Sequence, residues 1–144
     1  MFSGISNGMA SSLGRLSVLP YSSGMPRALV VKVTAGADDP ERCNQGFTVA
    51  VTAVAAGADV SLWLTGEAAW FGVPGRAEEF ALPHAQPLAD LLTAVVEGGS
   101  VTVCTQCAAR REIAAADLRE GIRLAGSASY VEEVLVEGVQ ALVY

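Results

Sequence analysis

The sequence predicts a single-domain, three-layer α/β fold built on a five-stranded, mainly parallel sheet. From Arg27 onward, β-branched apolar runs alternate with segments of helical periodicity, the pattern of parallel strands joined by helical crossovers. The 144 residues suffice for one buried core, and 51% of them are hydrophobic whereas 17% are charged. Such a composition is typical of a sheet that is covered on both faces.

The first two strands frame a long helix. The first strand is predicted over 28–34 and leads into a loop over 35–39, after which Pro40 fits the first helical position. The helix should run to about Ala56. Polar and apolar residues alternate along the second strand, 59–65, and we therefore interpret it as an edge strand.

The later elements follow the same alternation and complete the sheet. A short helix near 67–71 comes first, followed by a helix from Pro87 to the pair Gly98-Gly99. A strand is then predicted over 100–104, continued by a helix to about Ile113, and a further strand over 122–125. The last helix has the capping-box residues Ser129 and Glu132 and is closed by Gly138, and the last strand covers 139–144. Five strands joined in this way favour the doubly wound, flavodoxin-like order 2-1-3-4-5.

The N-terminal 25 residues differ from the rest of the chain. They are rich in Ser and Gly and contain no signal-peptide core, so residues 1–25 are predicted to be a disordered extension and 26–144 the folded domain. Three cysteines without a secretory signal indicate a reducing compartment, and we expect a cytoplasmic protein.

Charge and hydropathy argue against nucleic-acid binding and against a membrane span. Fifteen acidic and nine basic side chains give a net charge of −6, which provides no general attraction to nucleic acid. The longest apolar stretch, 47–64, is interrupted by Thr, Gly, Asp and Ser residues. No membrane span of about 20 apolar residues is therefore predicted.

The candidate chemistry lies on cysteines. Cys104 ends the third predicted strand, Cys107 lies in the first turn of the next helix, and Cys43 lies in the first turn of the helix after strand one. Because carboxyl ends of parallel strands share one edge, we expect the three thiols there, near a switch point between strands one and three. A helix N-terminus lowers a thiol pKa, and Arg110 and Arg111 add positive charge nearby.

Several alternatives compete with a reactive thiol. A buried cysteine is often only a small apolar residue, and this is the expectation for Cys43. The C-x-x-C spacing also suits a thioredoxin-like protein, although no proline follows Pro87 to supply the cis-proline loop. A zinc site would need Cys43, Cys104, Cys107 and His84, but the single histidine has no ligand spacing and is expected to be solvated. Glu67, Trp70 and Phe71 would either wall the site or pack as an apolar loop.

The segment from Val101 to Arg111 resembles the signature of the DsrE/DsrF-like (TusD-like) sulfur-relay family. In that signature a strand ends in cysteine, and an arginine pair follows six and seven residues later, which places Cys104, Arg110 and Arg111 here. The resemblance extends over roughly 25–144. Glu112, where many relatives have glycine, and Cys107, which some relatives lack, depart from the pattern.

The resemblance implies a sulfur carrier or sulfurtransferase in which Cys104 takes up persulfide sulfur and passes it to a partner protein. It also implies a homo-oligomer, trimer or hexamer, or a hetero-oligomer with paralogous subunits. No cofactor and no metal are expected. Two other functions remain open, namely a dithiol redox protein that uses Cys104 and Cys107 and a non-catalytic assembly or binding subunit.

Overall fold

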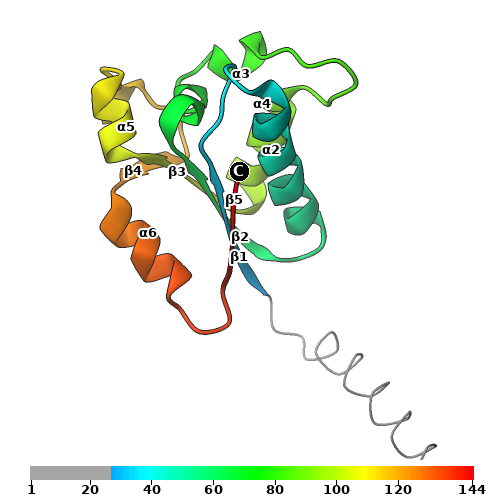
Figure 1. The fold of residues 1–144 in the computed structure, drawn as a ribbon, viewed down its shortest axis with the longest axis vertical. Coiled ribbons are helices and arrows are strands. Elements are labelled where there is room, and N and C mark those ends of the chain that lie inside the picture. The colour runs from blue at the N-terminus through cyan, green and yellow to red at the C-terminus, as the bar shows by residue number, and fades with distance from the viewer. Residues whose placement is uncertain (1–26) are drawn as a thin grey trace, which may run out of the picture.

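The computed structural model describes residues 27–144 and shows one five-stranded sheet (Figure 1). The predicted N-terminal extension lies outside the described residues. All four strand pairings are parallel. The strands are β1 (Ala28–Val33), β2 (Asp59–Leu64), β3 (Ser100–Cys104), β4 (Ile122–Ala125) and β5 (Gln140–Val143). The predicted fold class and the number of strands are confirmed.

The strand order is β4-β3-β2-β1-β5, and the predicted order 2-1-3-4-5 is wrong. Strand β2 lies in the centre, between β1 and β3, and is not an edge strand. Its polar residues suggested exposure, but Ser61 and Trp63 donate hydrogen bonds to the carboxylate of Glu133 on a covering helix. Strands one and three are therefore not neighbours. The chain adds strands in one direction from β1 to β4 and then crosses back over the sheet, so that β5 lies on the other side of β1.

Helices cover the two faces of the sheet unequally. Helices α2 and α4 pack together on one face, and α6 lies alone on the other (Figure 1). None of the helices between residues 27 and 144 has the length and apolar character needed to cross a membrane. The helical elements are α2 (Pro40–Ala55), η1 (Gly66–Gly72), α3 (Arg76–Glu79), α4 (Leu88–Gly98), α5 (Thr105–Arg110), η2 (Ala115–Asp117) and α6 (Ser127–Val134).

The end of α5 and both ends of α6 differ from the prediction. Helix α5 stops at Arg110, because Glu112 adopts a φ of 56° and Ile113 donates its N–H to the carbonyl of Ala108 at 2.9 Å. This left-handed position favours glycine. Helix α6 begins after Gly126 and ends at Val134, so the predicted capping box starting at Ser129 and the predicted end at Gly138 are both wrong.

The core fills the space between the sheet and the helical pair α2 and α4. Val31, Val33, Leu62, Leu64 and Val103 point into it and are fully buried. Each such side chain stabilises the fold by about 1.5–3 kcal/mol relative to an exposed position. The rigid sheet that results fixes the carboxyl edge at which the site lies.

The opposite face of the sheet carries polar residues in register. Lys32 pairs with Trp63, Trp63 with Thr102, and Thr102 with Arg123, so that one row crosses four strands. Only α6 covers this row, and the interactions are mainly polar: Arg123 donates to Thr102 at 2.8 Å and to Glu133 of α6 at 2.7 Å. A polar face of this kind is unusual in a parallel sheet.

Candidate functional site: a strand-end cysteine

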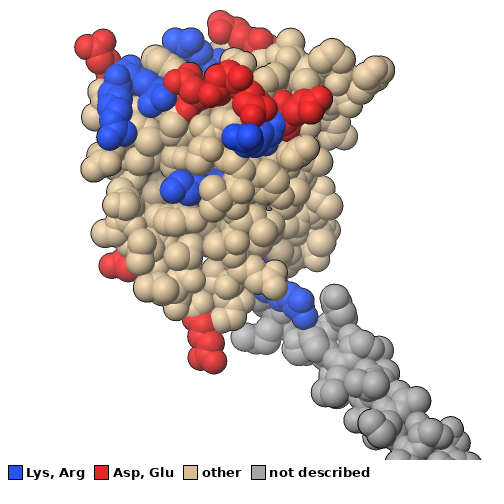
Figure 2. Space-filling view, in the orientation of Figure 1, with Lys and Arg blue, Asp and Glu red and all other residues tan. Residues whose placement is uncertain are grey.

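Cys104 is the last residue of β3 and the N-cap of α5. It is part-exposed, whereas its strand neighbours Val101, Thr102 and Val103 are buried. The strand thus holds the Cys104 backbone in the sheet while the thiol remains accessible. Figure 2 shows that charged side chains gather along the edge of the molecule at which the strands end, and that the face below is mostly uncharged.

The surroundings of Cys104 favour its thiolate. Burial raises the pKa of the Cys104 thiol, but hydrogen bonds donated by the backbone N–H and the thiol of Cys107 lower it. The backbone N–H of Gln106 and the positive charge of Lys32 act in the same direction. The net result is a pKa below the ordinary value of a cysteine, and the thiolate is the reactive form.

Cys107 has the opposite character. It is buried, and burial raises its pKa further than the hydrogen bond from Gly66 can lower it. Its sulfur accepts the Gly66 N–H at 3.1 Å, and its thiol donates to Cys104, which adds to the increase in pKa. In the hydrogen bond between the two thiols, Cys107 is therefore the donor and Cys104 the acceptor, and Cys104 is the thiol whose anionic form is favoured.

Gly66 makes this contact possible because it has no side chain. Its φ is 53°, and a Cβ atom at this position would lie 2.7 Å from the carbonyl oxygen of Thr34. Only glycine accommodates both the left-handed backbone and this close approach. The start of η1 can therefore bring its N–H to the sulfur of Cys107.

Neither arginine of the pair is among the groups that lower the pKa of Cys104. Arg110 is exposed, and no hydrogen bond or ion pair joins it to another residue of 27–144. Arg111 binds the carbonyl of Cys107 at 3.1 Å and the carboxylate of Glu67 at 2.7 Å. Its charge lowers the pKa of Cys107 and is balanced by Glu67, so Arg111 supports the turn beside the site.

The third thiol is structural in character. Cys43 lies on α2 with none of its surface exposed, and burial together with Asp38 and Asp39 raises its pKa to about 12. It therefore stays protonated at neutral pH and is inaccessible to partners. This agrees with the expectation of a small apolar residue.

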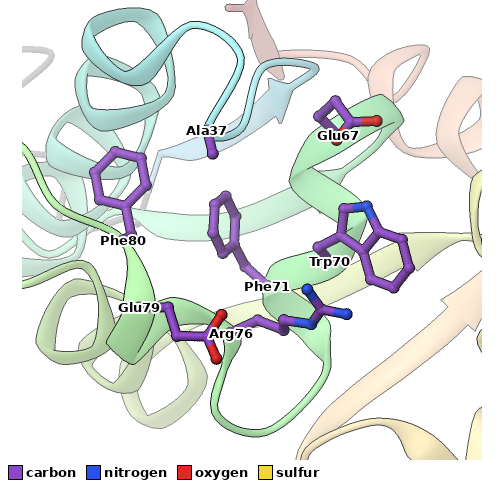
Figure 3. Close-up of a pocket in the computed structure, with 7 residues that line it drawn as sticks. All are labelled: Ala37, Glu67, Trp70, Phe71, Arg76, Glu79 and Phe80. Atoms are coloured by element: carbon purple, nitrogen blue, oxygen red, sulfur yellow. The ribbon is translucent and has the colours of Figure 1, made fainter.

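The remaining candidates lie apart from the thiols. His84 is exposed in a loop with a φ of 59°, and residues 27–144 contain no group of three or more potential metal ligands. Glu67, Trp70 and Phe71 do come together, in a pocket of about 280 Å³ between η1 and α3 (Figure 3). Arg76 stacks on Trp70 there at 4.4 Å. No cysteine lines this pocket, and its connection to the site is through Glu67 and Arg111.

Lys32 is the residue near Cys104 that the sequence interpretation missed. A lysine inside the apolar run Ala28-Leu-Val-Val-Lys-Val33 was the available signal, because a central parallel strand rarely carries a charge. The sequence did not show its relation to Cys104, because the two residues are about 70 positions apart in the chain. They lie on β1 and β3, which are separated in the sheet by β2.

Comparisons with known proteins agree with this architecture. The model of the DsrE/DsrF-like family matches residues 27–138. The Escherichia coli protein YchN is similar in structure, with a TM-score of 0.69 and 17% identity over 83% of this chain and 100% of that one. A protein of unknown function from Methanobacterium thermoautotrophicum has a TM-score of 0.61 and 11% identity over 82% of this chain and 99% of that one. A search of curated protein sequences finds no match.

Proposed function

This chain belongs to the DsrE/DsrF-like family, and we propose that it is a sulfur carrier that holds sulfane sulfur on Cys104. Members of the family act in sulfur relay with partner proteins and form oligomers. The observation that carries the proposal is the accessible strand-end thiol of Cys104, whose pKa is lowered although burial opposes this. A thiolate is the form that attacks a sulfane sulfur.

The chemistry consists of two exchange steps. In the first, the Cys104 thiolate attacks the outer sulfur of a donor persulfide, a new S–S bond forms, and the donor leaves as a thiolate with the electron pair of the broken S–S bond. In the second, an acceptor thiolate attacks the outer sulfur on Cys104, and Cys104 leaves as a thiolate. No oxidant or reductant is consumed, and the hydrogen bonds from Cys107 and Gln106 stabilise the Cys104 thiolate in its role as leaving group.

A dithiol redox function is the second candidate, and the hydrogen bond between the Cys107 thiol and Cys104 favours it. A disulfide would require Cys107 to attack as a thiolate. Its raised pKa and its burial oppose this step. Sulfur carriage is therefore the better supported of the two.

The proposal extends to partners and compartment. Sulfur donor and acceptor proteins would reach Cys104 from the exposed edge of the sheet. A homo-oligomer, or a hetero-oligomer with paralogous subunits, is supported by the apolar side chains that remain exposed on α6 and β5. Three free cysteines are consistent with a reducing, cytoplasmic environment.

The test is intact-mass spectrometry after incubation with glutathione persulfide. The wild type and Cys107→Ser, the matched control that also removes one thiol, should each gain a sulfur atom that excess thiol then removes. Cys104→Ser should gain none, with circular dichroism confirming its fold. A gain that persists in Cys104→Ser, or no gain in the wild type, contradicts the assignment and supports the redox or the assembly function.

A further inference from the structure

Lys32 carries a positive charge on the polar face of the sheet, below the edge at which Cys104 lies. Lys32 and Thr102 occupy one row across the sheet, separated only by Trp63. Cys104 follows Thr102 by two residues, and side chains two positions apart in a strand point to the same face. The lysine and the reactive thiol therefore share the face of the sheet that α6 covers.

Lys32 has no carboxylate partner in the described part of the chain. None of the ion pairs among residues 27–144 includes it. The carboxylate of Glu133, on the helix that covers this face, already accepts hydrogen bonds from Ser61, Trp63 and Arg123. A half-buried ammonium group without a counter-charge is unfavourable, so an anion that forms nearby would be stabilised.

Tyr130 of α6 defines the position of the lysine. The Lys32 ammonium lies 4.9 Å from the centre of the Tyr130 ring, within the range of a cation–π interaction. The same ring contacts Trp63 edge-on at 5.4 Å, which fixes its orientation. The contact places the Lys32 ammonium group beside the Tyr130 ring, between the sheet and α6.

The other groups around Cys104 do not provide this charge. Arg110 on α5 is exposed to solvent, and it is not among the groups that act on the Cys104 thiol. The other ionisable groups on the elements packed beside Cys104 are engaged elsewhere or neutral. These groups are Cys107 and Arg111 on or after α5, Tyr130 and Glu133 on α6, and Arg123 on β4, whose guanidinium binds Thr102 and Glu133.

We propose that Lys32 stabilises the anionic sulfur of Cys104, both as the thiolate and as the persulfide anion, and that Tyr130 is a positioning residue for its ammonium group. The role in the persulfide rests on the proposed sulfur-carrier function. The role in the thiolate does not. The two parts can therefore be tested separately.

The first experiment measures the rate at which iodoacetamide alkylates Cys104 as a function of pH, with the modified residue identified by peptide mass spectrometry. At neutral pH, Lys32→Met should react about threefold to tenfold more slowly than the wild type, since removal of a nearby cation lowers the thiolate population. Lys32→Arg keeps the charge and should react within about twofold of the wild type. The difference between Lys32→Met and the wild type should shrink as salt is added.

The second experiment separates positioning from general packing. Tyr130→Phe retains the ring and should alkylate at the wild-type rate, whereas Tyr130→Leu should be about twofold to threefold slower. In the Lys32→Met background the same Tyr130→Leu change should have no further effect. An equal effect in both backgrounds shows that Tyr130 acts independently of Lys32 and overturns its positioning role.

The outcomes distinguish this inference from the proposed function. If Lys32→Met alkylates at the wild-type rate while the wild type still gains sulfur, the inference is wrong and the carrier function stands. If the wild type gains no sulfur but Lys32→Met alkylates more slowly, the carrier function is wrong and thiolate stabilisation by Lys32 stands. If the wild type gains sulfur and Lys32→Met alkylates more slowly, both claims stand, and Lys32→Met should then also load sulfur more slowly than Lys32→Arg.

Discussion

Glu133 of α6 accepts a hydrogen bond from the indole N–H of Trp63 at 3.0 Å, and this contact joins the lone helix to the centre of the sheet. The same carboxylate accepts from Ser61 at 2.7 Å and from Arg123 at 2.7 Å. No residue of α6 is buried. The helix is thus attached by one acidic side chain and one aromatic ring more than by apolar packing.

Glu133→Gln should loosen this attachment. The amide has one acceptor oxygen in place of two and turns a donor toward existing donors, so the free energy of unfolding should fall by about 1–2 kcal/mol. Urea denaturation measures the loss, and Trp63 fluorescence should shift as its indole loses the acceptor. The matched control is Glu132→Gln, at the exposed neighbouring position, which should unfold like the wild type. Equal stability of all three proteins contradicts the attachment.

Cys107→Ser should lengthen the lifetime of a persulfide on Cys104. A Cys107 thiolate could attack Cys104 at its inner sulfur, form the Cys104–Cys107 disulfide and release hydrogen sulfide. The raised pKa of Cys107 makes this step slow, and serine removes it. The measurement is hydrogen sulfide release from the loaded protein at pH 7 and pH 9. Release should rise with pH in the wild type and stay at background in Cys107→Ser, and equal release from both proteins argues against any attack by Cys107.

Cys43 should make the fold sensitive to alkali. Its pKa is about 12 in the folded protein against 9.0 when exposed, so above pH 9 the unfolded chain loses a proton that the folded chain retains. Stability from this residue is complete below pH 9 and falls by about 1.4 kcal/mol per pH unit as the pH rises toward 12. Denaturation midpoints at pH 8, 9, 10 and 11 should therefore decline more steeply in the wild type than in Cys43→Ala. Parallel declines would mean that Cys43 ionises equally in both states.

The exposed apolar side chains of the C-terminal segment should form the contact between subunits. The large hydrophobic residues that remain exposed in residues 27–144 all lie on or near α6 and β5: Val131, Leu135, Val136, Leu142 and Val143, with Leu135 77% exposed. Leu135→Glu with Val143→Glu should convert an oligomer into monomer in light scattering coupled to size exclusion, because charges there oppose burial. Ala116→Glu, exposed in η2, adds a charge elsewhere and should leave the mass unchanged. A wild type that is already monomeric contradicts the contact.

The sequence predicted all five strands and most of the helices, but not which strands are neighbours, and the reactivity of Cys104 stays a prediction. β3 and β4 match their predicted bounds, because each is a short apolar run bounded by Gly or by a helix start. The central place of β2 was missed because its polar residues are satisfied by Glu133, about 70 residues away in the chain. Lys32 was missed because its position relative to Cys104 depends on the register of three strands.

The pairing of β1 with β5 has a consequence for how the protein is made. The backbone carbonyl of Lys32 accepts a hydrogen bond from the N–H of Tyr144 at 2.8 Å, and the hydroxyl of Thr34 donates to the carbonyl of Tyr144 across a separation of 110 residues. One side of β1 therefore stays open during synthesis until the C-terminal segment has left the ribosome. During that interval the nascent chain presents an apolar strand with free backbone donors and acceptors, which is where chaperones are most needed.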